Sequence, residues 1–136
     1  MHADFADLEA EWDAALDWDE RYALLIDLGR HLPPMDEALK TAATKVRGCS
    51  ANVWVYPLYE DGRLHFQADS DAAITKGIVA LVVRMADGKT AADVLATDFE
   101  GTIERLGLRQ HLSSNRTQGL PNMIARVREA ATRLAA

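Results

Sequence analysis

The sequence has very little cysteine: its 136 residues contain a single one, Cys49. One thiol cannot form an intramolecular disulfide, and without a Cys-x-x-Cys pair the chain offers neither a zinc ribbon nor a thioredoxin-type redox pair. An iron–sulfur cluster held by four cysteines of one chain is excluded on the same ground. Two interpretations of Cys49 stay open, a reactive thiol and a small buried hydrophobic residue.

Long apolar runs and an excess of positive charge are also missing. The longest apolar run covers residues 77–83, too short to span a bilayer, and the first residues lack the basic and apolar segments of a signal peptide. The formal net charge is −6, which disfavours nucleic acid as a partner because such binding needs clustered lysine and arginine. We therefore expect a single cytoplasmic domain over residues 1–136 that binds neither membranes nor nucleic acid.

Hydrophobic residues at three- and four-residue steps predict helices on both sides of the middle of the chain. The predicted helices cover residues 4–16, 19–32, 71–86, 90–96, 98–106 and 113–134. Residues 69–71 offer polar side chains that could cap the third of these helices. Pro121 either kinks the last helix or marks its true start.

Alternation of apolar and polar residues predicts strands between the two groups of helices. Residues 53–58 alternate with a period of two, and an Asp-Gly turn leads to a return strand over residues 63–69. A third short strand is predicted around residues 45–47, and Pro57 indicates an edge strand or a bulge. The sequence thus predicts an α+β fold, in which N-terminal and C-terminal helices pack against a small, mostly antiparallel, three-stranded sheet.

Cys49 lies between a basic stretch that contains glycine and the first predicted strand. Lys45 and Arg47 are close enough in sequence to favour the thiolate, and Gly48 leaves room for another molecule to approach. A neighbouring histidine would make Cys49 the nucleophile of a Cys/His hydrolase. The candidates for that general base are His31, His65 and His111. The opposite interpretation is an inert cysteine in a passive interaction domain.

A second candidate lies at the head of the last predicted helix, where Arg116 follows a run of serine and asparagine residues. The start of a helix attracts anions, so one interpretation is an anion-binding arginine. The other is a capped helix with a solvated arginine.

Four stretches, in order and spacing, resemble the SufE/CsdE family of cysteine desulfuration proteins, whose fold is shared with IscU-type scaffolds. The first, residues 47–54, contains the pattern Gly-Cys-x-x-x-Val-Trp around Cys49. The others are residues 21–34, 70–77 and 108–120. The resemblance covers the chain from about residue 19 to about residue 133.

The resemblance implies a sulfur acceptor rather than an enzyme. Members of this family take sulfur, held as a persulfide, from a PLP-dependent cysteine desulfurase of the SufS/CsdA type and pass it on to an iron–sulfur scaffold complex. Cys49 would be the persulfide acceptor and PLP would belong to the partner, so that no cofactor or metal of the chain's own is expected.

Sulfur-transfer chemistry fits a chain with one thiol. The attacking group should be a thiolate, and without a second cysteine the sulfur can leave only to another molecule or a reductant. Because exposed thiolates oxidise, we expect Cys49 on a loop that shields it and moves outward on docking. The residues predicted to serve partner docking around it are Arg47, Gly48, Ser50, Asp71, Lys76 and Arg116.

Overall fold

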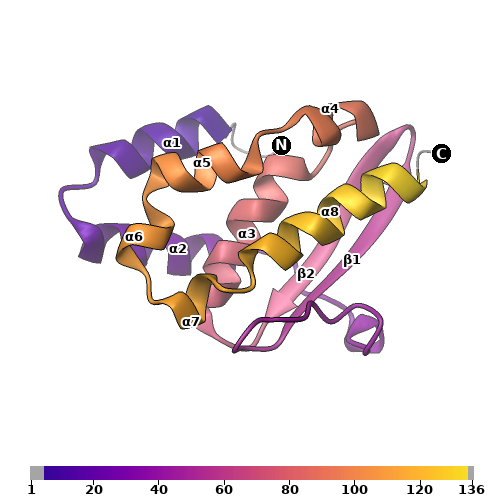
Figure 1. The fold of residues 1–136 in the computed structure, drawn as a ribbon, viewed down its shortest axis with the longest axis horizontal. Coiled ribbons are helices and arrows are strands. Elements are labelled where there is room, and N and C mark those ends of the chain that lie inside the picture. Colours follow the sequence, from indigo (N-terminus) through magenta and orange to yellow (C-terminus); the bar gives the residue numbers. More distant parts are fainter. Residues whose placement is uncertain (1–4, 135–136) are drawn as a thin grey trace.

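A computed structural model describes residues 5–134, which form a two-stranded sheet with helices packed against it (Figure 1). The elements in chain order are α1 (Phe5–Ala14), α2 (Trp18–Arg30), the short 3-10 helix η1 (Glu37–Leu39), β1 (Val53–Glu60), β2 (Arg63–Ser70), α3 (Ala73–Ala86), α4 (Ala91–Ala96), α5 (Phe99–Leu106), α6 (Leu108–His111), α7 (Ser114–Thr117) and α8 (Leu120–Leu134). The predicted α+β class is confirmed. Among the described residues, no helix is long and apolar enough to cross a membrane.

The strands β1 and β2 form an antiparallel hairpin in continuous register along their whole length. Its turn consists of Asp61 and Gly62, whose φ angles of 53° and 77° are the positive values that a type I′ turn requires. Pro57 pairs with Phe66 within this register without a bulge. Of the two alternatives for Pro57, the edge strand is therefore correct.

The prediction of a third strand around residues 45–47 is wrong. In the part of the chain that the structure describes, this segment adds only one isolated antiparallel bridge, between Lys45 and Trp54. The ladder stops because Gly48, with a φ of 84°, turns the chain directly afterwards. On the other side, the Arg126 guanidinium of α8 donates to the Lys45 carbonyl oxygen at 2.7 Å. The Arg126 side chain thus binds a backbone carbonyl group that would otherwise be free to pair with a further strand.

α3 is the central element of the fold, because it contacts α2, both strands of the hairpin and α8 (Figure 1). Its sequence is apolar almost all round, as expected of a helix covered on several sides. The contact with α2 is close at Gly77, where an added Cβ would overlap the carbonyl oxygen of Leu25. α3 therefore sets the relative positions of α2, the hairpin and α8.

The helix predicted over residues 113–134 is divided in two. α7 ends at Thr117 and α8 begins at Leu120, with Gln118 and Gly119 between them. Pro121 lies in the first turn of α8, where its missing N–H has no helical partner to lose. Of the two alternatives for Pro121, the true start of the helix is the correct one.

The carboxylate of Asp69, at the end of β2, joins two lysines from different elements. It accepts from the ammonium groups of Lys40 at 2.8 Å and Lys76 at 3.2 Å, and Lys40 also lies 5.2 Å from the ring centre of Trp54. Burial by itself raises the pKa of Asp69, but the hydrogen bonds from Lys40, the Ser70 N–H and Lys76 outweigh it, so that the pKa is lowered overall. This cluster fastens the loop before β1 to the start of α3.

Replacing Gly77 by alanine is expected to destabilise the protein. An overpacked methyl group costs up to about 3 kcal/mol, whereas the better helix propensity of alanine returns only about 1 kcal/mol. We expect a net loss of about 2 kcal/mol in the free energy of unfolding, measured by urea denaturation. A variant as stable as the wild type, or more stable, would show that α2 and α3 do not pack as closely as described.

Replacing Asp69 by asparagine is expected to change the acid dependence of stability. Because the folded-state pKa of Asp69 is lowered, its contribution is fully present above its unfolded pKa of about 3.9 and is lost as the pH falls through the folded value. The wild type should be more stable than Asp69→Asn at neutral pH, and the difference should shrink below about pH 4. Urea unfolding at a series of pH values measures it, and a difference that is unchanged down to the acid transition would contradict the cluster.

Candidate functional site

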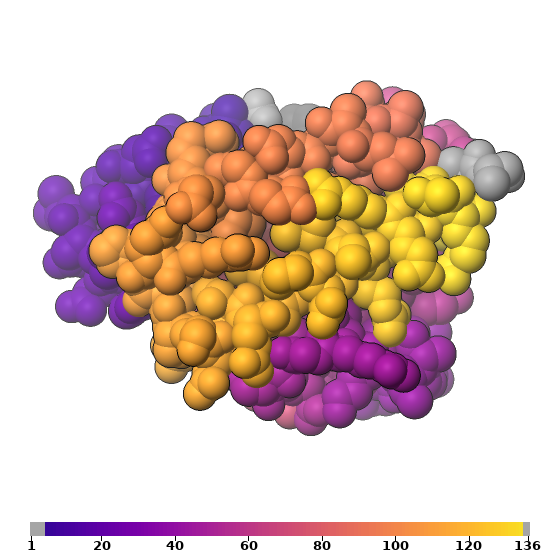
Figure 2. All heavy atoms as spheres, viewed as in Figure 1, coloured from indigo at the N-terminus to yellow at the C-terminus, as the bar shows by residue number. Residues whose placement is uncertain are grey.

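Cys49 lies in the loop of residues 47–52, here called the Cys49 loop, which leads into β1. The chain before β1 runs beside the N-terminal half of α8 on the face shown in Figures 1 and 2. The thiol is half-buried and packs against the edge of the hydrophobic core. The site is thus built where the loop meets the break between α7 and α8.

The sulfur of Cys49 rests directly on the backbone of Gly119, the last residue of that break. A Cβ added to Gly119 would overlap Sγ and would lie 3.1 Å from the Cys49 Cβ. The thiol therefore fills the volume that any side chain at position 119 would need. We call this packing the Gly119 contact.

Two hydrogen bonds hold the Cys49 loop to α7 and α8, one on each side of the cysteine. The Asn122 amide donates to the Arg47 carbonyl oxygen at 2.7 Å, and the Ser50 hydroxyl donates to the Asn115 carbonyl oxygen at 2.7 Å. Both partners of the loop come from a distant segment of the chain, since the separations are 75 and 65 residues. The position of the thiol thus depends on the docking of α7 and α8.

Asp71 holds the far end of the loop. Its carboxylate accepts from the backbone N–H of Asn52 at 3.0 Å and from the Asn52 side-chain amide at 2.8 Å. The Asp71 carboxylate therefore faces the loop and does not cap α3. The N-cap residue of α3 is Ala72, whose side chain cannot accept a hydrogen bond, so the prediction that residues 69–71 cap this helix is wrong.

Burial raises the pKa of the Cys49 thiol, because loss of water disfavours the charged thiolate. Lys45 and Arg47, which were expected to favour the thiolate, both have exposed side chains and do not offset the burial. The resting thiol is therefore protonated at neutral pH and less reactive than a free cysteine.

Three of the predicted docking residues, Ser50, Asp71 and Arg116, line one open depression beside the cysteine. The other residues of its wall are Ala51, Asn52, Ala72, Thr75, Ser113 and Asn115. The Arg116 side chain is exposed and makes no ion pair with any residue from 5 to 134. The depression thus presents one uncommitted guanidinium next to the loop that carries the thiol.

The remaining predicted docking residues lie outside this depression. Gly48 makes the turn before the cysteine and faces Asn122, and Arg47 is exposed on the α8 side of the loop. Lys76 is bound to Asp69 in the cluster described above. The structure therefore gives Lys76 a part in holding the fold, which its sequence position did not reveal.

Within residues 5–134, no histidine nitrogen lies within hydrogen-bonding distance of the Cys49 sulfur. The described partners are Asp27 for His31, Asp87 for His65 and the ring of Trp18 for His111. No group of three or more potential metal ligands forms among the described residues. The arrangement offers a shielded nucleophile without a general base, which disfavours the hydrolase interpretation.

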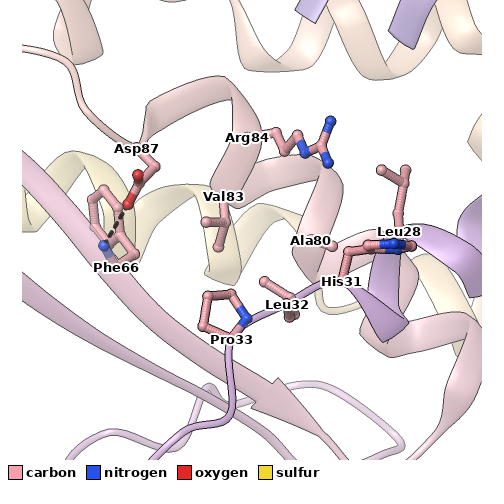
Figure 3. A pocket seen from close by; sticks show the side chains of 9 residues that line it. All are labelled: Leu28, His31, Leu32, Pro33, Phe66, Ala80, Val83, Arg84 and Asp87. Carbon is pink, nitrogen blue, oxygen red and sulfur yellow. Dashed lines mark hydrogen bonds between the residues drawn. The ribbon is translucent and has the colours of Figure 1, made fainter. Parts of the chain in front are cut away.

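A separate apolar pocket of about 140 Å³ lies between the end of α2, β2 and the C-terminal half of α3 (Figure 3). Its lining residues are Leu28, His31, Leu32, Pro33, Phe66, Ala80, Val83, Arg84 and Asp87. The Asp87 carboxylate accepts from the Phe66 N–H at 2.9 Å. Cys49 lies beside the opposite end of α3, so this pocket is not part of the thiol site.

The residues that position the thiol were largely missed by sequence reasoning. Asn115, Gly119 and Asn122 lie far from Cys49 in sequence, and each is an ordinary residue to find near a helix start. Two signals pointed to this region: Pro121, which indicates the start of a helix, and the resemblance of residues 108–120 to the family.

The fold is similar to that of a solved protein of low sequence identity. A solution structure of a hypothetical protein from Thermus thermophilus superposes with a TM-score of 0.76 at 20% identity, over 96% of this chain and 93% of that one. This likeness concerns the fold alone.

The sequence comparisons are more specific. Residues 6–131 match the model of the SufE family, the Fe–S metabolism associated domain. An uncharacterized SufE-like protein of Rhizobium meliloti strain 1021 is 39% identical over 119 residues, which cover 85% of each chain. The sulfur acceptor protein CsdE of Escherichia coli K12 is 38% identical over 117 residues, 85% of this chain and 79% of that protein. With nearly its whole length matched, the chain belongs to the SufE family.

Proposed function

We propose that the protein accepts sulfur from a cysteine desulfurase onto Cys49 and passes it on for iron–sulfur cluster assembly. The observation that carries the proposal is the position of the chain's one cysteine, on a loop held by side-chain bonds beside an open depression. Support also comes from CsdE, a relative that is named as a sulfur acceptor.

The proposed reaction is a sulfur exchange without net oxidation. The Cys49 thiolate attacks the terminal sulfur of a persulfide on the desulfurase and forms a new S–S bond. The S–S bond to the desulfurase cysteine breaks, and that cysteine leaves as a thiolate that takes up a proton. The proton lost by Cys49 balances the one gained by the leaving group.

The single thiol decides the fate of the sulfur once it is on Cys49. A second cysteine in reach could attack the persulfide, release sulfide and close a disulfide. This chain has no second cysteine, so the persulfide waits for an acceptor on another molecule. We propose an iron–sulfur scaffold complex as that acceptor.

The half-buried thiol is suited to a carrier that meets its donor only when docked. Burial raises the pKa of Cys49 and so protects it from oxidation while the protein is free. Docking has to move the Cys49 loop outward, which breaks the bonds from Asn122 and Ser50 and lets the thiol ionise in the partner's site. Arg47, Gly48 and Arg116 are the residues we expect the partner to contact first.

Catalytic power and cofactor would belong to the partner. We propose a PLP-dependent desulfurase of the SufS or CsdA type, which the protein stimulates as an accessory rather than as an enzyme. It would use no cofactor of its own and would work in the cytoplasm, where a free thiol stays reduced.

Cys49 is expected to become one sulfur atom heavier when the protein is incubated with a SufS-type desulfurase, PLP and L-cysteine. Intact-mass measurement under non-reducing conditions detects the added sulfur, and Cys49→Ser, which keeps the size of the side chain, should show none. The proposal fails if the desulfurase turns over normally while neither the mass of the protein nor the rate of desulfuration changes.

Replacing Arg116 by glutamine is expected to weaken docking. Loss of its uncommitted charge should raise the protein concentration that gives half-maximal desulfurase stimulation by roughly tenfold, about 1.4 kcal/mol of binding free energy. Arg133→Gln, at the far end of α8, is the matched control and should behave like the wild type. Equal effects of the two changes would remove Arg116 from the docking surface.

A further inference from the structure

We propose that Gly119 is a positioning residue for sulfur transfer, whose missing side chain allows Cys49 to rest in its shielded place. The inference rests on the proposed function for its consequence in sulfur transfer, whereas the shielding itself is a property of the free protein. Its physical basis is the Gly119 contact, in which the sulfur occupies the space of a Cβ.

The place of Gly119 in the helix makes its identity informative. Its carbonyl oxygen accepts the first helical hydrogen bond of α8, from the Met123 N–H at 3.0 Å, so that Gly119 is the N-cap residue. Serine, aspartate or asparagine at this position would usually stabilise a 15-residue helix better than glycine does. Here each of these side chains would displace the Cys49 sulfur. The need to admit the thiol therefore explains why the chain leaves this helix without a side-chain cap.

The surrounding bonds leave the sulfur as the movable partner of the contact. Gly119 is buried at the head of α8, and the first turn of that helix carries Asn122, which holds the Arg47 carbonyl oxygen. Cys49, in contrast, lies on a loop outside any helix or strand. Two side-chain hydrogen bonds to α7 and α8 and the hydrogen bonding of Asn52 to Asp71 hold this loop in place. A side chain at position 119 would push the thiol out toward solvent rather than move the helix.

Gly119→Ala is expected to expose Cys49 in the free protein. The rate of alkylation by iodoacetamide at neutral pH, followed by intact mass, should rise roughly tenfold, because a thiol in water ionises more readily than a buried one and is easier for the reagent to reach. The pH profile of the alkylation rate should shift to lower pH in the same variant. Gly62→Ala, in a hairpin turn with no atoms near the added Cβ, strains the backbone without touching the site and should leave both readouts unchanged.

A second measurement covers the case in which Gly119→Ala is poorly folded. The loss in thermal midpoint caused by Gly119→Ala should be several degrees in the wild-type background and less than half of that in Cys49→Ala, where the sulfur is gone. Equal losses in the two backgrounds, or an alkylation rate and pH profile that match the wild type, would overturn the proposal.

These readouts need no desulfurase, so their failure is distinct from a failure of the proposed function. With the desulfurase present, Gly119→Ala should load sulfur at a lower protein concentration than the wild type, because the shielded state no longer competes with docking. It should also be oxidised faster by air to a disulfide dimer linked through Cys49, because an exposed thiolate oxidises more readily.

Discussion

The packing of the Cys49 sulfur on the Gly119 backbone is the constraint on which the rest of the site depends. It requires a helix break at residues 118–119, a helix that starts without a side-chain cap, and a loop whose backbone is bound by that same helix. The result is a thiol that is protonated and shielded in the free protein but carried by a segment with few bonds to break. Both properties suit a sulfur carrier, and they follow from the same contact.

The remainder of the fold serves to bring distant segments to this point. α3 contacts α2, the hairpin and α8, and its first turn lines the depression beside the Cys49 loop. The cluster of Asp69 with Lys40 and Lys76 fastens the loop before β1 to the same end of α3. Two of the basic residues predicted to serve docking thus have different surroundings: Lys76 stabilises the fold through Asp69, whereas Arg116 faces solvent.

Local sequence pattern was sufficient for most of the helices and for the hairpin. Helical periodicity, the Asp61-Gly62 turn and the helix start marked by Pro121 predicted most elements, and the four stretches that resemble the family predicted the family. The third strand failed because Gly48, with a φ of 84°, turns the chain after a single bridge, and local pattern does not reveal which conformation a glycine adopts. The Gly119 contact and the Asn122 bond were out of reach because packing between residues far apart in sequence leaves no periodic trace. Burial, which only the folded chain defines, also decided the thiol pKa against the expectation from Lys45 and Arg47.

The most direct test of the account is the mass of the protein after it has been loaded with sulfur and separated from its desulfurase. The account predicts one additional sulfur atom on Cys49 that persists without an acceptor and is lost when an external thiol or an acceptor complex is added. A protein that gains no sulfur, or that loses it at the same rate whether or not an acceptor is present, would contradict the claim that Cys49 is an intermolecular sulfur carrier.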